Sequence, residues 1–211
     1  MADDFAALRA EYSDTGLNEA DLPPDPLTLF SSWFDEARVL PEPNAMVVAT
    51  VSGDGQPSAR TVLLKALDDR GFSFFTNLQS HKGSELRDNP KCALLFPWHP
   101  LQRQVRVEGR AQLLDRDEVT AYFATRPRGA QLGAIASPQS QVVTAEELQR
   151  SYAEAEGHFE RGTEVTAPLR WGGFVVVPER MEFWQGRANR MHDRWRYRRD
   201  GGAWVRERLA P

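Results

Sequence analysis

Residues 46–65 read MVVATVSGDGQPSARTVLLK, and this stretch decides the fold class. Two runs rich in apolar and β-branched residues, 46–51 and 58–65, flank the turn residues Ser52-Gly-Asp-Gly55. β-Branched residues favour strands, and a glycine-rich turn between two such runs is typical of a β-hairpin. The stretch therefore predicts two antiparallel strands joined by a short turn.

Similar strand signals continue along the chain. Strands are expected at 72–77, 92–96, 103–108, 171–178 and 181–184, with a final pair on either side of Asp200-Gly-Gly202. Residues 103–108 alternate polar and apolar, as a half-buried antiparallel strand does. Because the first three strands follow one another without a crossover helix, we expect an antiparallel barrel rather than a doubly wound parallel sheet.

Helices are expected between these strands. They are predicted at 27–38, from the Ser80 cap to about Asn89, at 115–125 and at 144–161, where Thr144 and Glu147 form a capping-box pattern. Residues 1–26 are acidic and rich in proline near their end, which indicates a short helix and a surface arm or lid. With no internal repeat and no linker, residues 27–211 are expected to form a single domain.

Composition excludes several classes of protein. Of the 211 residues, 41% are hydrophobic and 27% charged, the usual mix of a folded globular chain. A net charge of −4 argues against a general nucleic-acid binder, and no apolar run approaches the ~20 residues that span a bilayer. The acidic start does not resemble a secretory signal, and Cys92 with four scattered histidines offers no disulfide or metal-ligand spacing. We expect a cytoplasmic protein without nucleic-acid, membrane or metal partners.

Cations gather in three places that suit anions. Arg60 and Lys65 lie five residues apart on one strand and so point to opposite faces; they serve two pockets or two parts of one extended ligand, or are simply exposed. Residues 76–82 join a strand end to a helix start, where backbone N–H groups and Lys82 suit a phosphate, although a solvated helix needs the same Ser80 cap. Tyr122 and Arg126 share one helical face, as phosphate ligands or as a surface stripe.

The densest polar segment is 181–195, MEFWQGRANRMHDRW. If it is extended, Arg190, His192 and Arg194 alternate onto one face. Arginine stacks on flat rings and pairs with phosphate, so the segment predicts a pocket for a planar phosphorylated compound. The alternative is a basic strand with Trp184 and Trp195 in the core. Since no nucleophile pattern or glycine-rich phosphate loop is present in the sequence, redox chemistry would need a bound cofactor.

At these residues the chain resembles the pyridoxine (pyridoxamine) 5′-phosphate oxidase family, from about Leu8 to Pro211. The matching stretches are DLPPDPL (21–27), RTVLLK (60–65), FFTN (74–77), LFPW (95–98), RQV (103–105), RPR (126–128) and residues 181–194. The last stretch, with EFWQG at 182–186 and RMHDR at 190–194, is the most specific.

The resemblance implies a mainly β fold with added helices, an antiparallel FMN-binding split β-barrel. It further implies a homodimer with FMN at the subunit interface and a C-terminal segment for dimerisation and substrate binding. By position, FMN would contact Arg60, Thr61, Val62, Leu63, Leu64, Lys65, Phe75, Thr76, His81, Lys82, Gln104, Gln139, Ser140, Trp184 and Arg194. The substrate phosphate would be held by Lys65, Tyr122 and Arg126. Arg190 and His192 would bracket the substrate ring as the catalytic pair, and Arg9 and Tyr12 match a mobile lid.

The reaction implied is oxidation of pyridoxamine and pyridoxine 5′-phosphates by O₂ to pyridoxal 5′-phosphate, with release of H₂O₂ and of NH₃ from the amine, in vitamin B6 biosynthesis or salvage. Two alternatives remain: a related split-barrel flavin or deazaflavin oxidoreductase acting on another substrate, such as a phenazine precursor, and a non-catalytic pyridoxal-phosphate or flavin carrier.

Three positions depart from the family pattern. Ile135 replaces a common tryptophan but keeps an apolar packing position. His81 stands where a second arginine for the flavin phosphate is usual, and a neutral imidazole there is expected to weaken FMN binding by about 1 kcal/mol. Ala130 stands where a serine often meets the substrate phosphate, so KM is expected to rise through the loss of a hydrogen bond of about 1 kcal/mol.

Overall fold

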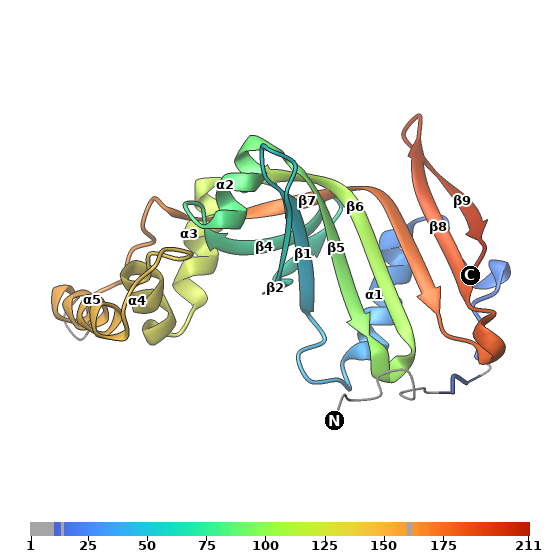
Figure 1. Cartoon of the computed structure of the whole chain (residues 1–211), viewed down its shortest axis with the longest axis horizontal. Helices are drawn as coiled ribbons and strands as arrows, with labels where there is room; N and C mark the ends of the chain where they lie inside the picture. Colours follow the sequence, from blue (N-terminus) through green and yellow to red (C-terminus); the bar gives the residue numbers. More distant parts are fainter. Residues whose placement is uncertain (1–10, 14, 160–161) are drawn as a thin grey trace, which may run out of the picture. The chain divides into compact units, whose positions relative to one another are not determined.

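Nine strands form one sheet in the computed structural model, which describes residues 11–13, 15–159 and 162–211 (Figure 1). The strands are β1 (Ala45–Val51), β2 (Pro57–Leu63), β3 (Ala66–Asp68), β4 (Gly71–Asn77), β5 (Lys91–Trp98), β6 (Arg103–Leu113), β7 (Trp171–Gln185), β8 (Asp193–Asp200) and β9 (Ala203–Leu209). Their order is β2-β1-β5-β6-β7-β4-β3, with β8 paired to β7 and β9 to β8. The ladders β3–β4, β4–β7, β7–β8 and β8–β9 are antiparallel. Hairpin signals predicted that consecutive strands pair, whereas β4 pairs with β7, which lies far along the chain.

Five α-helices accompany the strands in the described residues. They are α1 (Pro26–Ala37), α2 (His81–Asp88), α3 (Arg116–Thr125), α4 (Arg128–Ala136) and α5 (Ala145–His158). Four of them match the predicted helices, and the Thr144–Glu147 capping box is present at α5. The sequence pattern predicted no helix over the residues of α4, because Gly129 and Gly133 lower helix propensity in so short a segment. No helix in the described part of the chain is long and apolar enough to cross a membrane.

The chain divides into two compact units. Of the described residues, those within 11–46, 94–108 and 179–211 form unit 1, and those within 47–93 and 109–178 form unit 2. The long strands β1, β5, β6 and β7 contribute residues to both units.

The core of unit 1 is aromatic. Asp25 caps α1 by accepting the N–H of Leu27, and Pro26 occupies the first turn, where its missing N–H costs nothing. This places Phe30 against Phe96, with ring centroids 4.8 Å apart, and Trp33 edge-on to Phe183 at 5.3 Å. The predicted helix at 27–38 is therefore confirmed. The spacing of Phe30 and Trp33 turns both rings toward Phe96 and Phe183 in the core.

The segment before α1 is tied to β8. Trp195 Nε1 donates to the carbonyl of Leu17 (3.0 Å), and the Tyr197 hydroxyl donates to the carbonyl of Pro23 (2.9 Å). The short helix predicted within residues 1–26 is a 3₁₀ turn, η2 (Glu19–Asp21). Residues 17–23 are thus fixed to unit 1, whereas residues 1–10 of the predicted arm lie outside the described residues.

The core of unit 2 lies between β4, β7 and the helices that follow β6. Buried members of this cluster include Val119 and Phe123 of α3, Leu132 of α4, Ala155 of α5 and Trp171 of β7. Helices α4 and α5 lie side by side (Figure 1). The three helices therefore pack around one core. Helices α3 and α4 also line a cavity together with residues of β2 and β4.

Strand β7 is a single strand of 15 residues, whereas the sequence predicted two pieces separated near Pro178. Its ladder with β4 ends at Val176, and its ladder with β8 begins at Arg180. Pro178 lies between these two ladders on that edge, where a missing backbone N–H is tolerated. Proline thus marks a change of ladder partner and not the end of the strand.

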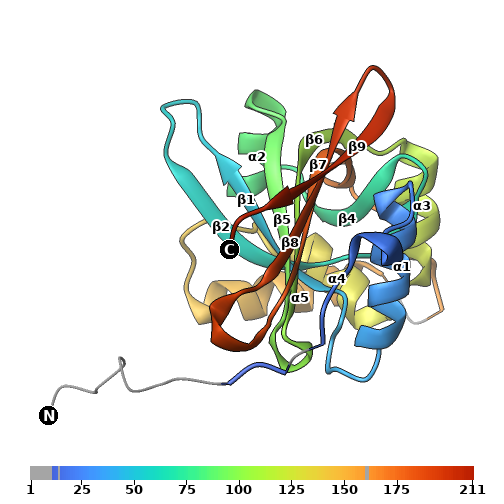
Figure 2. The ribbon, with the colours of Figure 1, turned by 90° about the vertical axis from the view of Figure 1, so that its right-hand side faces the viewer.

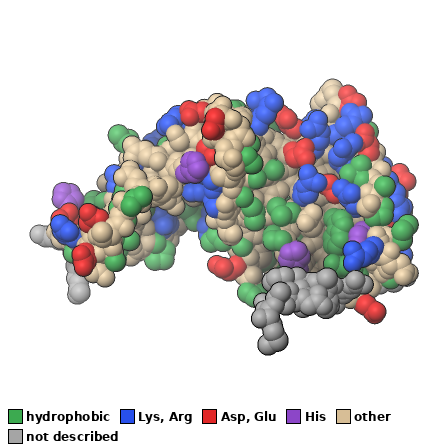
Figure 3. Space-filling model, viewed as in Figure 1, with side chains coloured by type: hydrophobic (Ala, Val, Ile, Leu, Met, Phe, Trp, Pro, Cys, Tyr) green, Lys and Arg blue, Asp and Glu red, His purple; other side chains and the backbone are tan. Residues whose placement is uncertain are grey.

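The final pair of strands is confirmed as the hairpin β8–β9 (Figure 2). Gly201 and Gly202 form its turn with φ values of 55° and 92°, a conformation that favours glycine. The arginines of this segment are largely matched by acids: Arg196 and Arg198 both pair with Glu207, at 2.7 and 2.8 Å. Basic and acidic side chains accordingly intermingle over the hairpin in Figure 3.

Candidate active site

A cavity of about 790 Å³ lies in unit 2. Its lining includes many of the residues singled out from the sequence: Arg60, Thr61, Val62, Leu63, Lys65, Phe75, Thr76, His81, Lys82, Tyr122, Arg126, Gln139 and Ser140. Asn77, Ala130, Gly133, Ala134, Ser137 and Trp171 complete the lining. The volume is in the range that holds cofactor-sized ligands.

Arg60 and Lys65 line this one cavity. Strand β2 ends at Leu63, so the strict alternation that predicted opposite faces stops before Lys65. Leu64 is buried, and the N–H of Lys65 donates to the carbonyl of Ser73 at 2.8 Å. The sequence left open whether Arg60 and Lys65 serve two pockets, two parts of one ligand or neither. Because both residues line the same cavity, the structure supports two parts of one extended site.

The first cationic group of the cavity surrounds the start of α2. Ser80 caps the helix by accepting the N–H of Gly83, as predicted. Lys82 is buried, and its ammonium donates to Thr76 Oγ1 at 3.0 Å and to Gln139 Oε1 at 3.5 Å. Burial, and secondarily the charge of Arg60, lowers the pKa of Lys82. In the described part of the chain no carboxylate forms an ion pair with Lys82, so this end of the cavity suits an anion.

The second cationic group lies on a stack of aromatic rings. Phe75 and Tyr122 are stacked with centroids 4.0 Å apart, and Phe75 and Trp171 are stacked at 5.4 Å. The Arg126 guanidinium lies over the Trp171 ring, 5.0 Å from its centroid. Within the described residues Arg126 Nη1 is buried without a hydrogen-bond partner, and burial lowers the pKa of Arg126. A buried N–H group without an acceptor is destabilising, so Nη1 also suits an anionic ligand.

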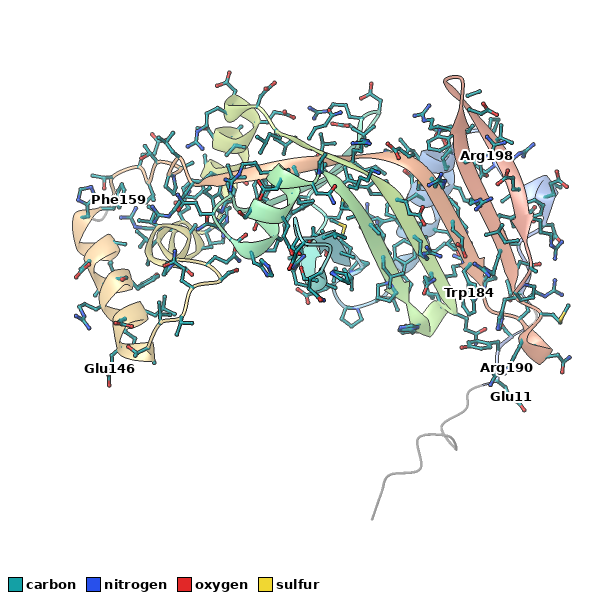
Figure 4. All side chains as sticks on the ribbon, turned by 45° about the horizontal axis from the view of Figure 1, so that its top comes forward. Glu11, Glu146, Phe159, Trp184, Arg190 and Arg198 are labelled. Atoms are coloured by element: carbon teal, nitrogen blue, oxygen red, sulfur yellow. The ribbon has the colours of Figure 1, made fainter. Side chains whose placement is uncertain are left out.

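The 181–195 segment lies in unit 1 and differs from the predicted extended strand. Residues Ala188–Arg190 form a 3₁₀ turn, η4, and both Asn189 and Arg190 have positive φ, 56° and 61°. Strand β8 begins only at Asp193. The expectation that Arg190, His192 and Arg194 alternate along one strand face is therefore wrong for Arg190, because the backbone turns at that residue. In Figure 4, Trp184 is labelled near the end of β7 and Arg190 at the turn that leads into β8.

His192 has a defined hydrogen bond. Its Nδ1 accepts the backbone N–H of Arg187 at 3.1 Å, and its ring lies 4.6 Å from Trp184 and 5.4 Å, edge-on, from Tyr12. Partial burial, and then the charge of Arg190, lowers the pKa of His192. The imidazole is thus held neutral, with Nδ1 as the acceptor and the proton on Nε2.

Other predicted residues are placed as follows. Trp184 is half-buried and pairs across the β7–β8 ladder with Arg194, whereas Trp195 is in the core. Arg194 Nε donates to Glu182 at 2.8 Å. Gln104, Trp184, Arg190, His192 and Arg194 belong to unit 1, and among the described residues none of them lines the cavity of unit 2. Arg9 lies outside the described residues.

Two buried carboxylates were missed by the sequence analysis. Asp193 accepts from the N–H of Leu17 (3.1 Å), from Arg187 (3.2 Å) and from Arg208 (2.7 Å). Glu85 accepts from side chains behind the cavity and lies four residues after His81. The i,i+4 spacing from His81 on a capped helix was the available signal for Glu85, whereas nothing in the sequence marked Asp193 as an anchor.

An antiparallel sheet with added helices and a cavity lined by two groups of cations are the features expected of a split-barrel protein that binds an anionic cofactor. Residues 35–158 match the family described as pyridoxamine 5′-phosphate oxidase, and residues 171–211 match the pyridoxine 5′-phosphate oxidase C-terminal dimerisation region. The chain belongs to the pyridoxamine 5′-phosphate oxidase family and is an oxidoreductase. Membership confirms the predicted family and its cofactor, FMN, and the second match supports the predicted homodimer.

Curated relatives carry the same description over the full chain. A pyridoxine/pyridoxamine 5′-phosphate oxidase of Nocardioides sp. (strain ATCC BAA-499 / JS614) is 56% identical, covering 99% of this chain and 98% of that protein. One from Pseudomonas paraeruginosa (strain DSM 24068 / PA7) is 50% identical and covers all of both chains.

Solved structures confirm the split-barrel fold. PhzG from Burkholderia lata 383, in complex with tetrahydrophenazine-1-carboxylic acid, matches with a TM-score of 0.88 at 33% identity, covering 94% of this chain and 100% of that one. A pyridoxamine 5′-phosphate oxidase-related, FMN-binding protein from Nostoc punctiforme PCC 73102 matches with a TM-score of 0.72 at 16% identity, covering 87% and 96%.

Proposed function

We propose that this enzyme oxidises pyridoxine and pyridoxamine 5′-phosphates to pyridoxal 5′-phosphate. The alcohol gives up two electrons and two protons to O₂, forming the aldehyde and H₂O₂; the amine consumes one water in addition and releases NH₃. The observation that carries the proposal is the presence, in one cavity, of two cationic groups that no carboxylate neutralises among the described residues: Lys82 at the start of α2, and Arg126, whose Nη1 has no hydrogen-bond partner. One fits the phosphate of FMN and the other the phosphate of the substrate.

FMN would be held mainly around β2 and α2. Arg60, His81 and Lys82 would bind its phosphate, together with the backbone N–H groups at the helix start. The remaining proposed contacts are Thr61, Val62, Leu63, Leu64, Lys65, Phe75, Thr76, Gln104, Gln139, Ser140, Trp184 and Arg194. When bound, the flavin ring supplies the two-electron acceptor that O₂ reoxidises. In the homodimer FMN would lie at the subunit interface, lined by residues of both subunits.

The substrate phosphate would be held by Lys65, Tyr122 and Arg126, which line the same cavity. Anchoring the phosphate fixes the distance between the substrate carbon C4′ and the cofactor, which is a proximity effect. The stacked rings of Phe75, Tyr122 and Trp171 hold the phenol and the guanidinium in place before the substrate arrives. Binding energy is then spent on orienting the substrate and not on ordering the site.

Arg190 and His192 would contact the substrate ring as the catalytic pair, and Tyr12, with Arg9, would close over it. The hydrogen bond from Arg187 leaves His192 with its proton on Nε2. We propose that His192 donates from Nε2 to an oxygen substituent of the ring and does not act as a base through Nδ1. Tyr12 contacts both the Trp184 and His192 rings, which supports a shared role for these three residues toward the substrate.

A related oxidase acting on a phenazine precursor is the second candidate, favoured by the likeness to PhzG. Arg126 alone does not separate the two, because a guanidinium pairs with a carboxylate as well as with a phosphate. The set of Lys65, Tyr122 and Arg126 in one cavity supports the phosphorylated substrate instead, since two cations and a phenol suit a dianion better than a single carboxylate. A non-catalytic flavin or pyridoxal-phosphate carrier is distinguished by turnover.

The deciding experiment mixes the FMN-loaded enzyme, without oxygen, with pyridoxine 5′-phosphate, pyridoxamine 5′-phosphate or tetrahydrophenazine-1-carboxylic acid, and follows flavin absorbance. Bleaching by the B6 phosphates, followed by recovery in air with pyridoxal phosphate and H₂O₂, supports the proposal. Bleaching by the phenazine precursor alone would replace it with the second candidate, and tight FMN binding without bleaching would indicate a carrier.

Arg190→Ala is the matched variant for this experiment. It should retain FMN and lose most of kcat/KM, since the residue is exposed and its only proposed role is toward the substrate. Unchanged turnover in Arg190→Ala would remove Arg190 from the site.

A further inference from the structure

We propose that Glu85 is a positioning residue that orients Arg60 for the phosphate of FMN. The inference rests on the proposed function in one respect, namely that the FMN phosphate binds at the start of α2. Glu85 itself does not line the cavity, so its effect must pass through the residues that it holds.

Glu85 is a buried carboxylate surrounded by donors. Its side chain is 4% exposed and accepts hydrogen bonds from Thr50 Oγ1 (2.5 Å) and from Ser58 Oγ (2.8 and 2.9 Å). Arg60 Nη2 lies 3.3 Å from one carboxylate oxygen, and His81 Nε2 lies 3.3 Å from the other. Two strands and a helix therefore converge on this one carboxylate.

The guanidinium of Arg60 is held from behind by the same group of residues. Besides Glu85, Arg60 Nη2 donates to Ser58 Oγ (2.5 Å), while Nη1 donates to the Thr50 hydroxyl and to the carbonyl of Val48 (3.3 Å). Ser58 thus bridges the carboxylate and the guanidinium. The Arg60 side chain remains 21% exposed and lines the cavity, so the network fixes the cation while leaving it available to a ligand.

A carboxylate beside an anion site has two opposing effects. Its negative charge repels a phosphate through a partly buried medium, which weakens binding. Its hydrogen bonds hold Arg60 in one orientation, which strengthens binding because a preorganised donor loses less entropy when the ligand arrives. Burial raises the pKa of Glu85, but hydrogen bonds from Thr50 and Ser58 and the charges of His81 and Arg60 outweigh this, and the pKa lies below the ordinary value. The carboxylate is therefore charged in the working enzyme, and positioning must outweigh repulsion if it serves FMN binding.

These two effects predict opposite results for Glu85→Gln, which removes the charge and keeps the shape. If positioning dominates, apo-protein carrying Glu85→Gln should bind FMN about tenfold more weakly than wild type in a fluorescence titration. If repulsion dominates, the same variant should bind FMN more tightly, and that outcome would overturn the proposal. An unchanged dissociation constant would also overturn it.

Three further measurements test whether Glu85 changes FMN affinity through Arg60 and the phosphate. Asp88→Asn is the matched control: it removes one negative charge from the same helix at a side chain that is 63% exposed, and should leave FMN affinity unchanged. Riboflavin, which lacks the phosphate, should bind wild type and Glu85→Gln equally. In an Arg60→Ala background, Glu85→Gln should no longer weaken FMN binding; an undiminished effect there would show that Glu85 does not act through Arg60 and would overturn the proposal.

Ser58→Ala tests the same network if Glu85→Gln fails to fold, which a thermal melt reports. Removing the bridging hydroxyl should weaken FMN binding in the same direction as Glu85→Gln, and unchanged affinity would count against the proposal. Arg60→Ala and Lys82→Ala separate this inference from the placement of FMN. If neither weakens FMN binding, the phosphate lies elsewhere and the proposed site fails; if both weaken it and Glu85→Gln does not, only the role of Glu85 fails.

Discussion

The surroundings of Arg126 indicate that this side chain binds a ligand. Its guanidinium rests on Trp171, and its buried Nη1 has no partner among the described residues. The cation–π contact is favourable, but the buried Nη1 loses its hydration without gaining a hydrogen bond in the protein, which is destabilising. Arg126 is therefore expected to lower the stability of the fold and to raise the affinity for the substrate.

Arg126→Leu tests this trade. The apolar side chain keeps contact with Trp171 and removes the unsatisfied group, so Tm should be unchanged or higher. KM for pyridoxine 5′-phosphate should rise at least about tenfold, because a charge-assisted hydrogen bond to phosphate is lost. Steady-state kinetics and a thermal melt measure both quantities, and a large drop in Tm together with an unchanged KM would contradict the proposed role.

His192 should influence the pH profile of kcat/KM. Because its pKa is lowered, the imidazole stays neutral and Nε2 remains a single donor as pH falls through the ordinary histidine range near 6.5. Protonation of Nδ1 would break the hydrogen bond from the Arg187 N–H that positions the ring, so the acidic limb that belongs to His192 should lie below that range and disappear in His192→Gln, whose amide nitrogen can replace the Nε2 donor. The limb that remains in the variant reports the substrate phosphate, which also titrates near pH 6. A profile that is identical in the two proteins would remove His192 from the rate-controlling steps.

His81 gives a test of the cofactor phosphate. Replacing it by arginine places a permanent cation at the mouth of the site, so His81→Arg should tighten FMN binding about fivefold at low ionic strength, and less in high salt. Fluorescence titration at two salt concentrations checks both parts. Equal affinities of wild type and variant for FMN would show that position 81 does not reach the phosphate.

At the scale of elements, Asp193 fastens three segments together. Its carboxylate is 2% exposed and joins Leu17 of the N-terminal segment, Arg187 before η4 and Arg208 of β9. The adjacent His192 and the turn that carries Arg190 depend on this anchor for their position.

Asp193→Asn should lower the free energy of unfolding by about 2 kcal/mol, because a buried amide cannot replace the carboxylate toward two guanidinium groups. Chemical unfolding measures the change, and kcat/KM should fall with FMN retained. Asp200→Asn, at the exposed end of the same strand, is the matched control and should be within about 0.5 kcal/mol of wild type. Equal losses in the two variants would show that Asp193 is no special anchor.

The sequence predicted most elements but not their local exceptions. Helix α1 followed from the spacing of Phe30 and Trp33, and α5 from its capping box, because both signals are local. The turn at Arg190 did not follow, since a positive φ at a non-glycine residue is imposed by tertiary contacts. Among site residues, the cations Arg60, Lys82 and Arg126 were found through their charge and spacing. The supporting carboxylates were not, because a single Asp or Glu has no pattern until its partners are brought near it.

At the scale of the whole molecule, the dimerisation region defines the expected assembly. Native mass spectrometry of the loaded enzyme should give two chains of 23.8 kDa with two FMN molecules. A monomer that binds one FMN with full turnover would contradict the proposed placement of the cofactor at the subunit interface.

The aromatic stack also gives the cavity a fluorescent side chain, Trp171. Of the six tryptophans in the chain, Trp171 alone belongs to unit 2, and its indole lines the cavity against Phe75 and Arg126. A molecule that enters the cavity would change the polarity around this indole, and FMN bound there as proposed would accept its excitation energy. The difference in ultraviolet emission between wild type and Trp171→Phe is therefore a built-in optical gauge of occupancy, which can follow loading of the site in real time without any attached dye.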